Sequence, residues 1–394
     1  MQSLHHDLIE RATAYVPTLR ARAAATEERR SVLPEVMADL HRLGLIKHFQ
    51  PVRLGGIAAP WGIQFDIGRI LAHGCPSTAW IATVVAANNC YACRFPLRTQ
   101  EEIYGAGPDV LVTNASVSRN VVVKTEAGGY RVSGAWKFAS GIDHSSWVLI
   151  VGAIEAPSSA NSPAARLFML VPRRDYRIED NWHVAGMRGT GSKDIVLEGA
   201  FVPAHRTLTP GAFWNAGCPG GQRGDAFIWR RDLTGYFGTS LLGPIVGAAE
   251  AILETYLEAT RTRVGVMMGD APATQATVQI RVAESSAEIK LARLVLETQM
   301  AELRRRGEAD EAWTTAEVVE MARDRAYATR LCQVAGERLV TPMGALGMFD
   351  SNPVQRYWRD LNAAATQIAV NYDRNLVPYG RLALGLDPGV AGML

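Results

Sequence analysis

The chain has 394 residues, of which 48% are hydrophobic and 20% are charged. This mix is typical of a folded globular protein and excludes general disorder. Lys and Arg (41) nearly balance Asp and Glu (39), so the formal charge of +2 gives no strongly basic surface for nucleic acid. The length predicts two or three domains, each able to bury a core.

Membrane, secretory and metal-binding classes are not indicated either. The chain lacks a run of about 18 apolar residues, and its N-terminus is charged and helical in pattern, unlike a secretory signal. The five cysteines are scattered, and the Cys90–Cys93 pair lacks the second pair or nearby histidines of a zinc site. We therefore expect reduced thiols, a cytoplasmic location and no metal centre.

Residues 1–111 are predicted to form an N-terminal helical domain. Apolar residues recur at helical spacing at Leu33, Val36, Met37, Leu40 and Leu43. A segment rich in small apolar residues opens at Ser77 and runs to about Tyr91. Small residues let neighbouring elements approach closely, so this segment is predicted to be a buried helix.

Residues 112–208 change to the period of strands. A turn signal at 127–129 separates two runs of β-forming residues, and further strands are predicted at 147–153, 166–171 and 194–201. Short strands with Gly and Pro between them favour a small β-barrel or sandwich. Residues 210–224 have the composition of a Gly-rich linker.

Residues 225–394 are predicted to be helical again. One seam for bundle packing steps by four and three residues through Val278, Val282, Ser285, Ile289, Ala292 and Leu296. A second long helix is predicted over 315–339. The fold class is therefore α+β, with an N-terminal helical domain, a central β domain and a C-terminal four-helix bundle.

Several common catalytic signatures are missing from the sequence. No GxGxxG follows a strand, and neither a GxxxxGK[ST] loop nor a GxSxG elbow is present, so a nicotinamide site, a phosphate loop and a nucleophile elbow are not predicted. No histidine follows His205. Proton transfer from the C-terminal bundle would therefore need another residue type, or water.

The order of helices, strands and helices resembles the acyl-CoA dehydrogenase superfamily, and four motifs carry the resemblance. They are WKFASG at 136–141, GMRGTGSKDIVLEGAFVPA at 186–204, RTRVG at 261–265 and PVQRYWRD at 353–360. Val264 stands where the superfamily motif has Phe. The resemblance covers nearly the whole chain in order, and it implies a flavin held beside the β domain.

Within this superfamily, CPSTAW, FASGIDHSSW, GMRGTGS and QRYWRD resemble the two-component flavin monooxygenases. This branch includes the oxygenase component of 4-hydroxyphenylacetate hydroxylase and the hydroxylases of steroid-derived phenols. The resemblance implies that the flavin is contacted by Trp80, Asn114, Ala115, Ser116, Phe138, Ala139, Ser140, Arg261, Ala345 and Leu346.

Two of these residues suit particular atoms of a flavin. The hydroxyl of Ser140 could hydrogen-bond ring N5, and Arg261 could bind flavin phosphate as a charged fork, reaching across a subunit interface. Plainer roles stay open: a strand-end hydrogen bond for Ser140, a solvated helix position for Arg261 and a core position for Trp80.

The position that separates dehydrogenase from oxygenase chemistry holds Gln367-Ile368. Many acyl-CoA dehydrogenases carry a Glu base there, and its absence argues against that chemistry. The oxygenase branch usually has a histidine there, and often another on the helix after STAW, where this chain has Asn88. The side-chain amides of Gln367 and Asn88 can only hydrogen-bond. These two residues and Ile368 are predicted to contact the substrate, and Ser140 and Gln367 are the candidate catalytic residues.

The resemblance implies a monooxygenase that uses FADH2 or FMNH2 from a separate NAD(P)H:flavin reductase. Oxygen would add to flavin C4a, and the resulting C4a-hydroperoxyflavin would hydroxylate a hydrophobic, polyaromatic or indole-like small molecule, in natural-product tailoring or aromatic catabolism. A homotetramer is also implied. The alternatives are an amine N-oxygenase on the same fold, an acyl-CoA dehydrogenase-like flavoenzyme, and a flavin-binding protein without catalysis.

Overall fold

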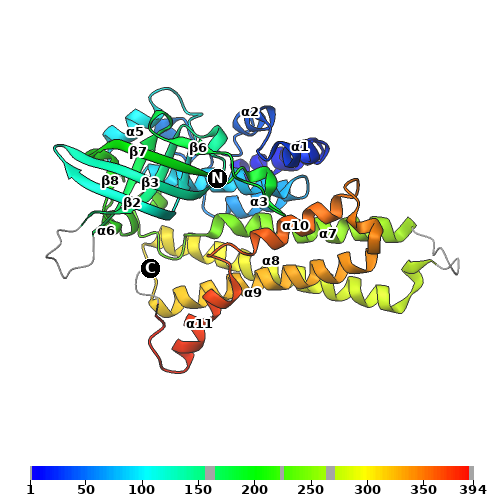
Figure 1. Cartoon of the computed structure of the whole chain (residues 1–394). Coiled ribbons are helices and arrows are strands. Elements are labelled where there is room, and N and C mark those ends of the chain that lie inside the picture. Colours follow the sequence, from blue (N-terminus) through cyan, green and yellow to red (C-terminus); the bar gives the residue numbers. More distant parts are fainter. Residues whose placement is uncertain (1, 156–164, 222–225, 263–270, 390–394) are drawn as a thin grey trace.

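The computed structural model describes residues 2–155, 165–221, 226–262 and 271–389. Helices come first, strands follow, and a helical bundle ends the chain (Figure 1). The N-terminal helices are α1 (Gln2–Arg29), α2 (Pro34–Arg42), α3 (Ile63–Ala72), α4 (Pro76–Ala92) and α5 (Leu97–Tyr104). The predicted order of an N-terminal helical domain, a central β domain and a C-terminal helical bundle is confirmed.

The described residues in the middle of the chain form two four-stranded sheets. Their strands are β1 (Val112–Ala115), β2 (Val117–Glu126), β3 (Gly129–Ala139), β4 (Trp147–Ala153), β5 (Arg166–Pro172), β6 (Arg177–Glu179), β7 (Lys193–Pro203) and β8 (Thr207–Leu208). One sheet has the order β1-β4-β5-β8 and the other β2-β3-β7-β6, as expected for a sandwich. Trp136 is fully buried between them and donates from Nε1 to the Val151 carbonyl at 2.8 Å.

The segment after the strands differs from the predicted linker. Residues Pro210–Trp214 form a short helix, α6, because the Thr209 side chain caps the Ala212 amide and Pro210 suits the first turn. The linker prediction was therefore wrong for these five residues.

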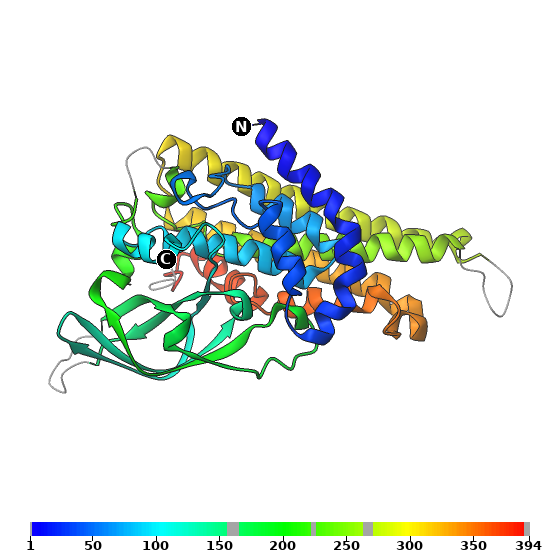
Figure 2. The same cartoon turned by 90° about the horizontal axis from the view of Figure 1, so that it is seen from above.

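The C-terminal bundle is built from long helices. These are α7 (Leu242–Thr262), α8 (Ala276–Ala309), α9 (Thr315–Val340), α10 (Pro353–Ala364) and the short α11 (Tyr372–Ala383), with a 3-10 segment η9 (Thr341–Met348) before α10. Five of the six seam residues predicted on α8 are buried, which confirms the seam. Figure 2 shows that the bundle extends well past the sheets at one end.

Residues Thr239–Thr262, which include α7, are apolar and long enough to cross a membrane by length and composition alone. In that stretch, 67% of the most apolar window is buried inside the protein, as in the core helix of a bundle. Gly243 and Gly247 let α7 approach α3 closely, since a Cβ at Gly247 would lie 2.1 Å from the Arg69 carbonyl oxygen.

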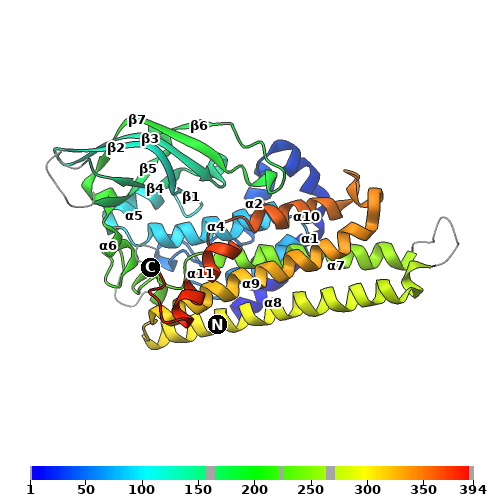
Figure 3. The ribbon, with the colours of Figure 1, turned by 60° about the horizontal axis from the view of Figure 1, so that its bottom comes forward.

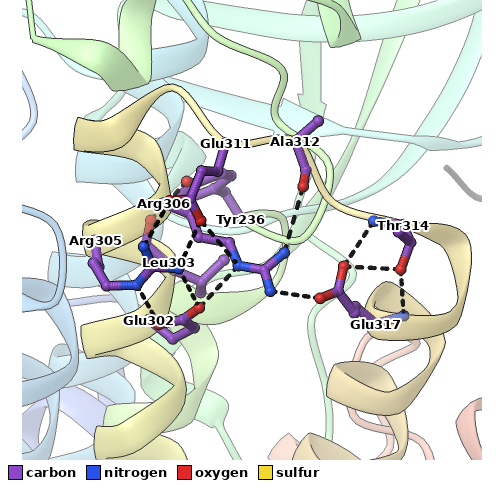
Figure 4. Close-up of polar contacts among 9 residues, drawn as sticks. All are labelled: Tyr236, Glu302, Leu303, Arg305, Arg306, Glu311, Ala312, Thr314 and Glu317. Carbon is purple, nitrogen blue, oxygen red and sulfur yellow. Dashed lines mark hydrogen bonds and ion pairs between the residues drawn. The ribbon is translucent and has the colours of Figure 1, made fainter.

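The turn between α8 and α9 is fixed by charges (Figure 4). Arg306 donates to Glu302 at 2.8 Å and to Glu317 at 2.5 Å, and Glu317 also completes a capping box with Thr314. Tyr236 donates to the Leu303 carbonyl at 2.7 Å and so ties the segment before α7 to this end of the bundle.

A partly buried ionic cluster joins the N-terminal helices to the bundle. His73 lies 3.1 Å from Glu250 and 3.0 Å from Glu254, and Arg69 also pairs with Glu250. Burial alone would lower the pKa of His73, but its hydrogen bonds to the two carboxylates outweigh burial and raise this pKa to about 9. His73 therefore keeps its charge at neutral pH and fixes the end of α3 against α7.

Candidate active site

The predicted flavin residues of the β domain meet at one corner beside α4. Thr113 of β1 donates from its hydroxyl to the Ser140 carbonyl, which brings 113–116 next to 138–140. Asn89 of α4 accepts from the Val112 amide at 3.3 Å, and Gly141 packs on Ile81 and Val85. Figure 3 shows α4 between the strands and the bundle helices. Trp80 is carried on this same helix.

The predicted residues of this corner differ in what they offer. Asn114 is partly exposed, and Ser116, the residue after β1, is exposed. The side chains of Ala115 and Ala139 are buried in the sheet core, so only their backbone can face a ligand. Phe138 has a left-handed φ of 67° and an exposed ring, which lies 6.2 Å from Trp182. A bulky residue in this conformation marks local strain.

Ser140 begins a row of hydroxyl groups. Its Oγ lies 2.7 Å from the Ser192 Oγ, which lies 2.7 Å from the Thr190 Oγ1. Thr190 in turn donates to the Met187 carbonyl at 2.8 Å. The row joins the FASG segment to the GMRGTGS segment, so the two sequence motifs form one structural unit.

The GMRGTGS segment is held from behind by a buried carboxylate. Asp360 of α10 accepts from the Met187 amide at 2.5 Å and from the Ser77 hydroxyl of α4 at 3.1 Å. Gly186 must be glycine here, because a Cβ would lie 2.0 Å from the Arg359 carbonyl oxygen. Three elements distant in the sequence therefore meet at Asp360.

Along one face of α4, side chains at helical spacing are slightly exposed to solvent. Trp80 (8%), Val84 (9%), Ala87 (6%) and Tyr91 (8%) follow each other at steps of four, three and four, whereas Ile81, Ala82, Val85 and Ala86 are at 0%. Asn88 lies within this set of residues, and its buried Nδ2 has no hydrogen-bond partner among the described residues. We call Trp80, Val84, Ala87, Asn88 and Tyr91 the open face of α4.

Aromatic rings cover the far end of the open face. Phe237 stacks on Tyr91 with ring centres 6.3 Å apart and meets Trp214 edge-on at 5.4 Å. Phe237 is 38% exposed. We call Tyr91, Trp214 and Phe237 the aromatic wall.

Two buried arginines fix this wall through backbone carbonyls. Arg94 donates to the carbonyls of Phe213, Asn215 and Arg231 at 2.6, 2.5 and 2.7 Å. Arg325 donates to the carbonyls of Gly235 and Phe237 and to Gln299. Burial lowers the pKa of Arg325 to about 10, and no described carboxylate pairs with either guanidinium. Charges buried this way need every donor satisfied, so the wall is held rigidly.

The predicted substrate residues after α10 lie beside this wall. Gln367 and Ile368 form a turn in which the Gln367 Oε1 accepts from the Ala369 amide at 2.6 Å. Gly238, next to Phe237, packs against Ala369, since a Cβ there would lie 2.6 Å from the Ala369 Cβ. Ile368 is exposed and Gln367 is half-buried.

The remaining predicted flavin residues lie at the other end of the molecule. Arg261 is exposed in the last turn of α7, and Ala345 and Leu346 are exposed in η9. Both segments lie at the end of the bundle away from the sheets (Figures 1 and 3). Residues 263–265 of the RTRVG motif lie outside the described residues. One copy of the chain therefore does not bring Arg261 to Ser140.

The corner beside α4 has features that suit a flavin ring. The open face of α4 is apolar, and a half-exposed serine hydroxyl and an unpartnered buried amide offer the few polar contacts that a flat cofactor and its substrate need. Sequence reasoning assigned no role to Thr190, Ser192, Asp360, Tyr91 or Phe237. The concentration of aromatic residues in 213–237 was the one available signal for the wall.

The chain is similar to known proteins over nearly its whole length. A family model described as acyl-CoA dehydrogenase, C-terminal domain, matches residues 240–372. The flavin-dependent monooxygenase oxygenase subunit HsaA of Rhodococcus jostii is 32% identical and covers 96% of this chain and 98% of its own. The oxygenase component of an FADH2-dependent resorcinol hydroxylase from a Rhizobium species is 31% identical, over 98% of this chain and 95% of its own. XiaF from a Streptomyces species, solved with FADH2 and glycerol, superposes with a TM-score of 0.89 at 27% identity, over 99% of this chain and 98% of its own.

The Asp360 junction predicts a defined dependence of stability on pH. Burial raises the pKa of Asp360 to about 6, although its hydrogen bond from Met187 lowers it. The unfolded value is about 4, so between these values the folded state binds more protons and the unfolding free energy falls as pH rises. Asp360→Asn should remove this contribution to the pH dependence of the unfolding free energy, while it keeps a hydrogen bond to Met187 and one to Ser77.

Asp360→Ala should instead lower the unfolding free energy by about 2–3 kcal/mol, because the Met187 amide and the Ser77 hydroxyl lose their acceptor. Urea unfolding of the three proteins at pH 4.5 and pH 7 measures both effects. An Asp360→Asn protein with the wild-type slope, or an Asp360→Ala protein as stable as Asp360→Asn, would contradict this role.

Proposed function

The chain belongs to the oxygenase subunits of the flavin-dependent monooxygenases, and from this membership we propose that it hydroxylates a hydrophobic aromatic small molecule at the corner between α4 and the sheets. Bound reduced flavin supplies the electrons and the carbon at which oxygen is activated. The observation that carries the proposal is the open face of α4, because this helix packs against Gly141, next to Ser140, and its open face ends at the aromatic wall.

The substrate class follows from what lines this face. Val84 and Ala87 are apolar, Tyr91 and Phe237 offer ring faces, and Asn88 offers one unpartnered amide. The seven helical steps from Val84 to Tyr91 span about 10 Å of helix. A flat molecule of two or three fused rings with one polar substituent suits this length and chemistry. Polyketide phenols and indoles are such molecules.

The chain's own residues position such a substrate and do not deprotonate it. Asn88 and Gln367 carry amides, which donate and accept hydrogen bonds but take no proton near pH 7. The substrate ring must therefore be electron-rich as bound, or give its proton to water. In this proposal, the Ser140 hydroxyl hydrogen-bonds the flavin ring at N5.

The cofactor's phosphate end and the assembly complete the proposal. Arg261 and the segment 345–346 lie too far along the bundle to serve the same copy's corner, so they would bind the flavin of a neighbouring subunit in a homotetramer. A separate reductase supplies the reduced flavin. The five buried free thiols suit a cytoplasmic location, and natural-product tailoring is the role we favour.

The oxygen reaction tests the proposed function directly. Protein and reduced flavin are mixed anaerobically and then with oxygen in a stopped-flow spectrometer. We expect a spectral phase that matches neither reduced nor oxidised flavin, and Ser140→Ala should shorten its lifetime about tenfold through the lost hydrogen bond. Ser118→Ala, an exposed serine of β2, is the control. Direct reoxidation that yields only peroxide in the wild type would refute the proposal.

The aromatic wall can be tested by binding alone. Phe237→Ala should weaken binding of 2-naphthol about tenfold, because one face of the ring pair is lost. Phe201→Ala removes an exposed ring on β7 and should leave binding within twofold. Calorimetric titration with 2-naphthol measures both variants, and equal affinities in the two would exclude the wall as the substrate's contact.

Arg261 tests the shared cofactor site. Arg261→Ala should weaken flavin binding at least tenfold, because a charge-assisted fork to phosphate is lost, while the fold stays intact at this exposed position. Arg98→Ala, on α5, removes an equally exposed arginine. Flavin fluorescence titration gives the affinities and light scattering gives the mass. A monomeric wild type that binds flavin as tightly as its Arg261 variant would rule out the shared site.

A further inference from the structure

The row of hydroxyls behind Ser140 has a direction that its geometry dictates. Each of its three contacts is an oxygen–oxygen distance of 2.7 or 2.8 Å. Two oxygens this close repel each other unless a hydrogen lies between them. The row therefore contains one hydrogen in each contact, and three hydroxyls supply three hydrogens.

The carbonyl at the end of the row settles which way these hydrogens point. A carbonyl oxygen has no hydrogen, so Thr190 must donate to Met187. With that hydrogen used, Ser192 must donate to Thr190, and Ser140 must then donate to Ser192. Ser140 has one hydrogen and it is committed inward. Toward any ligand, the Ser140 oxygen can only accept.

The row is anchored so that this direction is stable. Met187 has a left-handed φ of 56°, and its amide is held by Asp360. Its carbonyl also receives the Trp182 indole N–H at 3.1 Å and the Thr190 amide at 3.2 Å. The Met187 peptide is thus fixed from both sides. No hydroxyl in the row titrates near neutral pH, so the direction does not change with pH.

Only the first hydroxyl of the row reaches a ligand. Ser192 and Thr190 are buried, with 4% and 2% of their surface exposed, whereas Ser140 is partly exposed beside the corner that α4 completes. Within the row, the Ser140 oxygen is therefore the one that can accept a hydrogen bond from a ligand, because the other two hydroxyls are buried.

The two redox states of a flavin differ at the atom that would meet this acceptor. N5 of the reduced ring carries a hydrogen and donates, whereas N5 of the oxidised ring has only a lone pair and accepts. Resting on the function proposed above, we propose that Thr190 and Ser192 are positioning residues that make Ser140 an obligate acceptor and so make the site prefer reduced over oxidised flavin. Neither residue touches the flavin itself.

The test compares the affinities of one protein for the two flavin states. Dissociation constants for FAD and, anaerobically, for FADH2 give a ratio for each variant. Thr190→Val and Ser192→Ala each free the Ser140 hydrogen to turn outward, and each should lower the preference for FADH2 about tenfold, one hydrogen bond's worth. The two-electron potential of bound flavin should fall by about 30 mV, the same factor of ten.

Matched variants separate direction from packing. Thr190→Ser keeps the hydroxyl and should keep the wild-type ratio within twofold. Ser145→Ala removes a buried hydroxyl that donates to the nearby Gly141 carbonyl outside the row, and should do the same. A merely structural role would weaken both flavin states equally in Thr190→Val and Ser192→Ala.

Each outcome decides one claim. Ratios that fall in Thr190→Val and Ser192→Ala, and hold in Thr190→Ser and Ser145→Ala, support the proposal. A wild type that binds both states while every variant keeps its ratio overturns the hydroxyl row and leaves the proposed monooxygenase intact. A wild type that binds neither state overturns the proposed function as well. If one of the two key variants does not fold, the other still decides.

Discussion

The buried carboxylate of Asp360 is the contact on which the site's geometry depends. It lies on α10 of the bundle, yet its two hydrogen bonds go to the first turn of α4 and to the Met187 peptide of the loop before β7. A carboxylate that is buried away from water must accept hydrogen bonds from the protein. The Met187 amide and the Ser77 hydroxyl are therefore held in place. The N-terminal helices, the β domain and the bundle are thus joined at the two carboxylate oxygens of Asp360, next to the predicted flavin corner.

From Asp360, a series of hydrogen bonds extends to Ser140 at the corner. Met187 is strained and fixed, Thr190 and Ser192 follow it, and Ser140 ends the row at the surface of the corner. A network in which every member is satisfied is rigid and specifies one arrangement. The aromatic wall is held in a similar way, because the guanidinium groups of Arg94 and Arg325 donate to backbone carbonyls of the segments that carry it. Both the hydroxyl row and the aromatic wall are therefore held by hydrogen bonds within the chain itself.

The sequence predicted most of the architecture, but only some of the contacts that build the candidate site. Period and turn signals located β4 and the α8 seam because each depends on residues near in the chain. The row from Ser140 to Met187 joins residues some fifty positions apart through hydroxyls that have no periodic signal, so the motifs were visible but their contact was not. Helix α6 was missed because a cap and a proline outweighed a loop-like composition.

In the proposed function, the amides at Asn88 and Gln367 would limit the chemistry that this chain's own residues supply. His144 is committed to the Val32 carbonyl, and burial lowers its pKa, while His205 pairs with Glu102 at 2.8 Å. Burial raises the pKa of the Tyr91 phenol, which removes it as a base near neutral pH. In the proposed function, activation of the substrate would then come from its own electron density and from exclusion of water, so selection among aromatic substrates would depend on ring shape and one hydrogen bond.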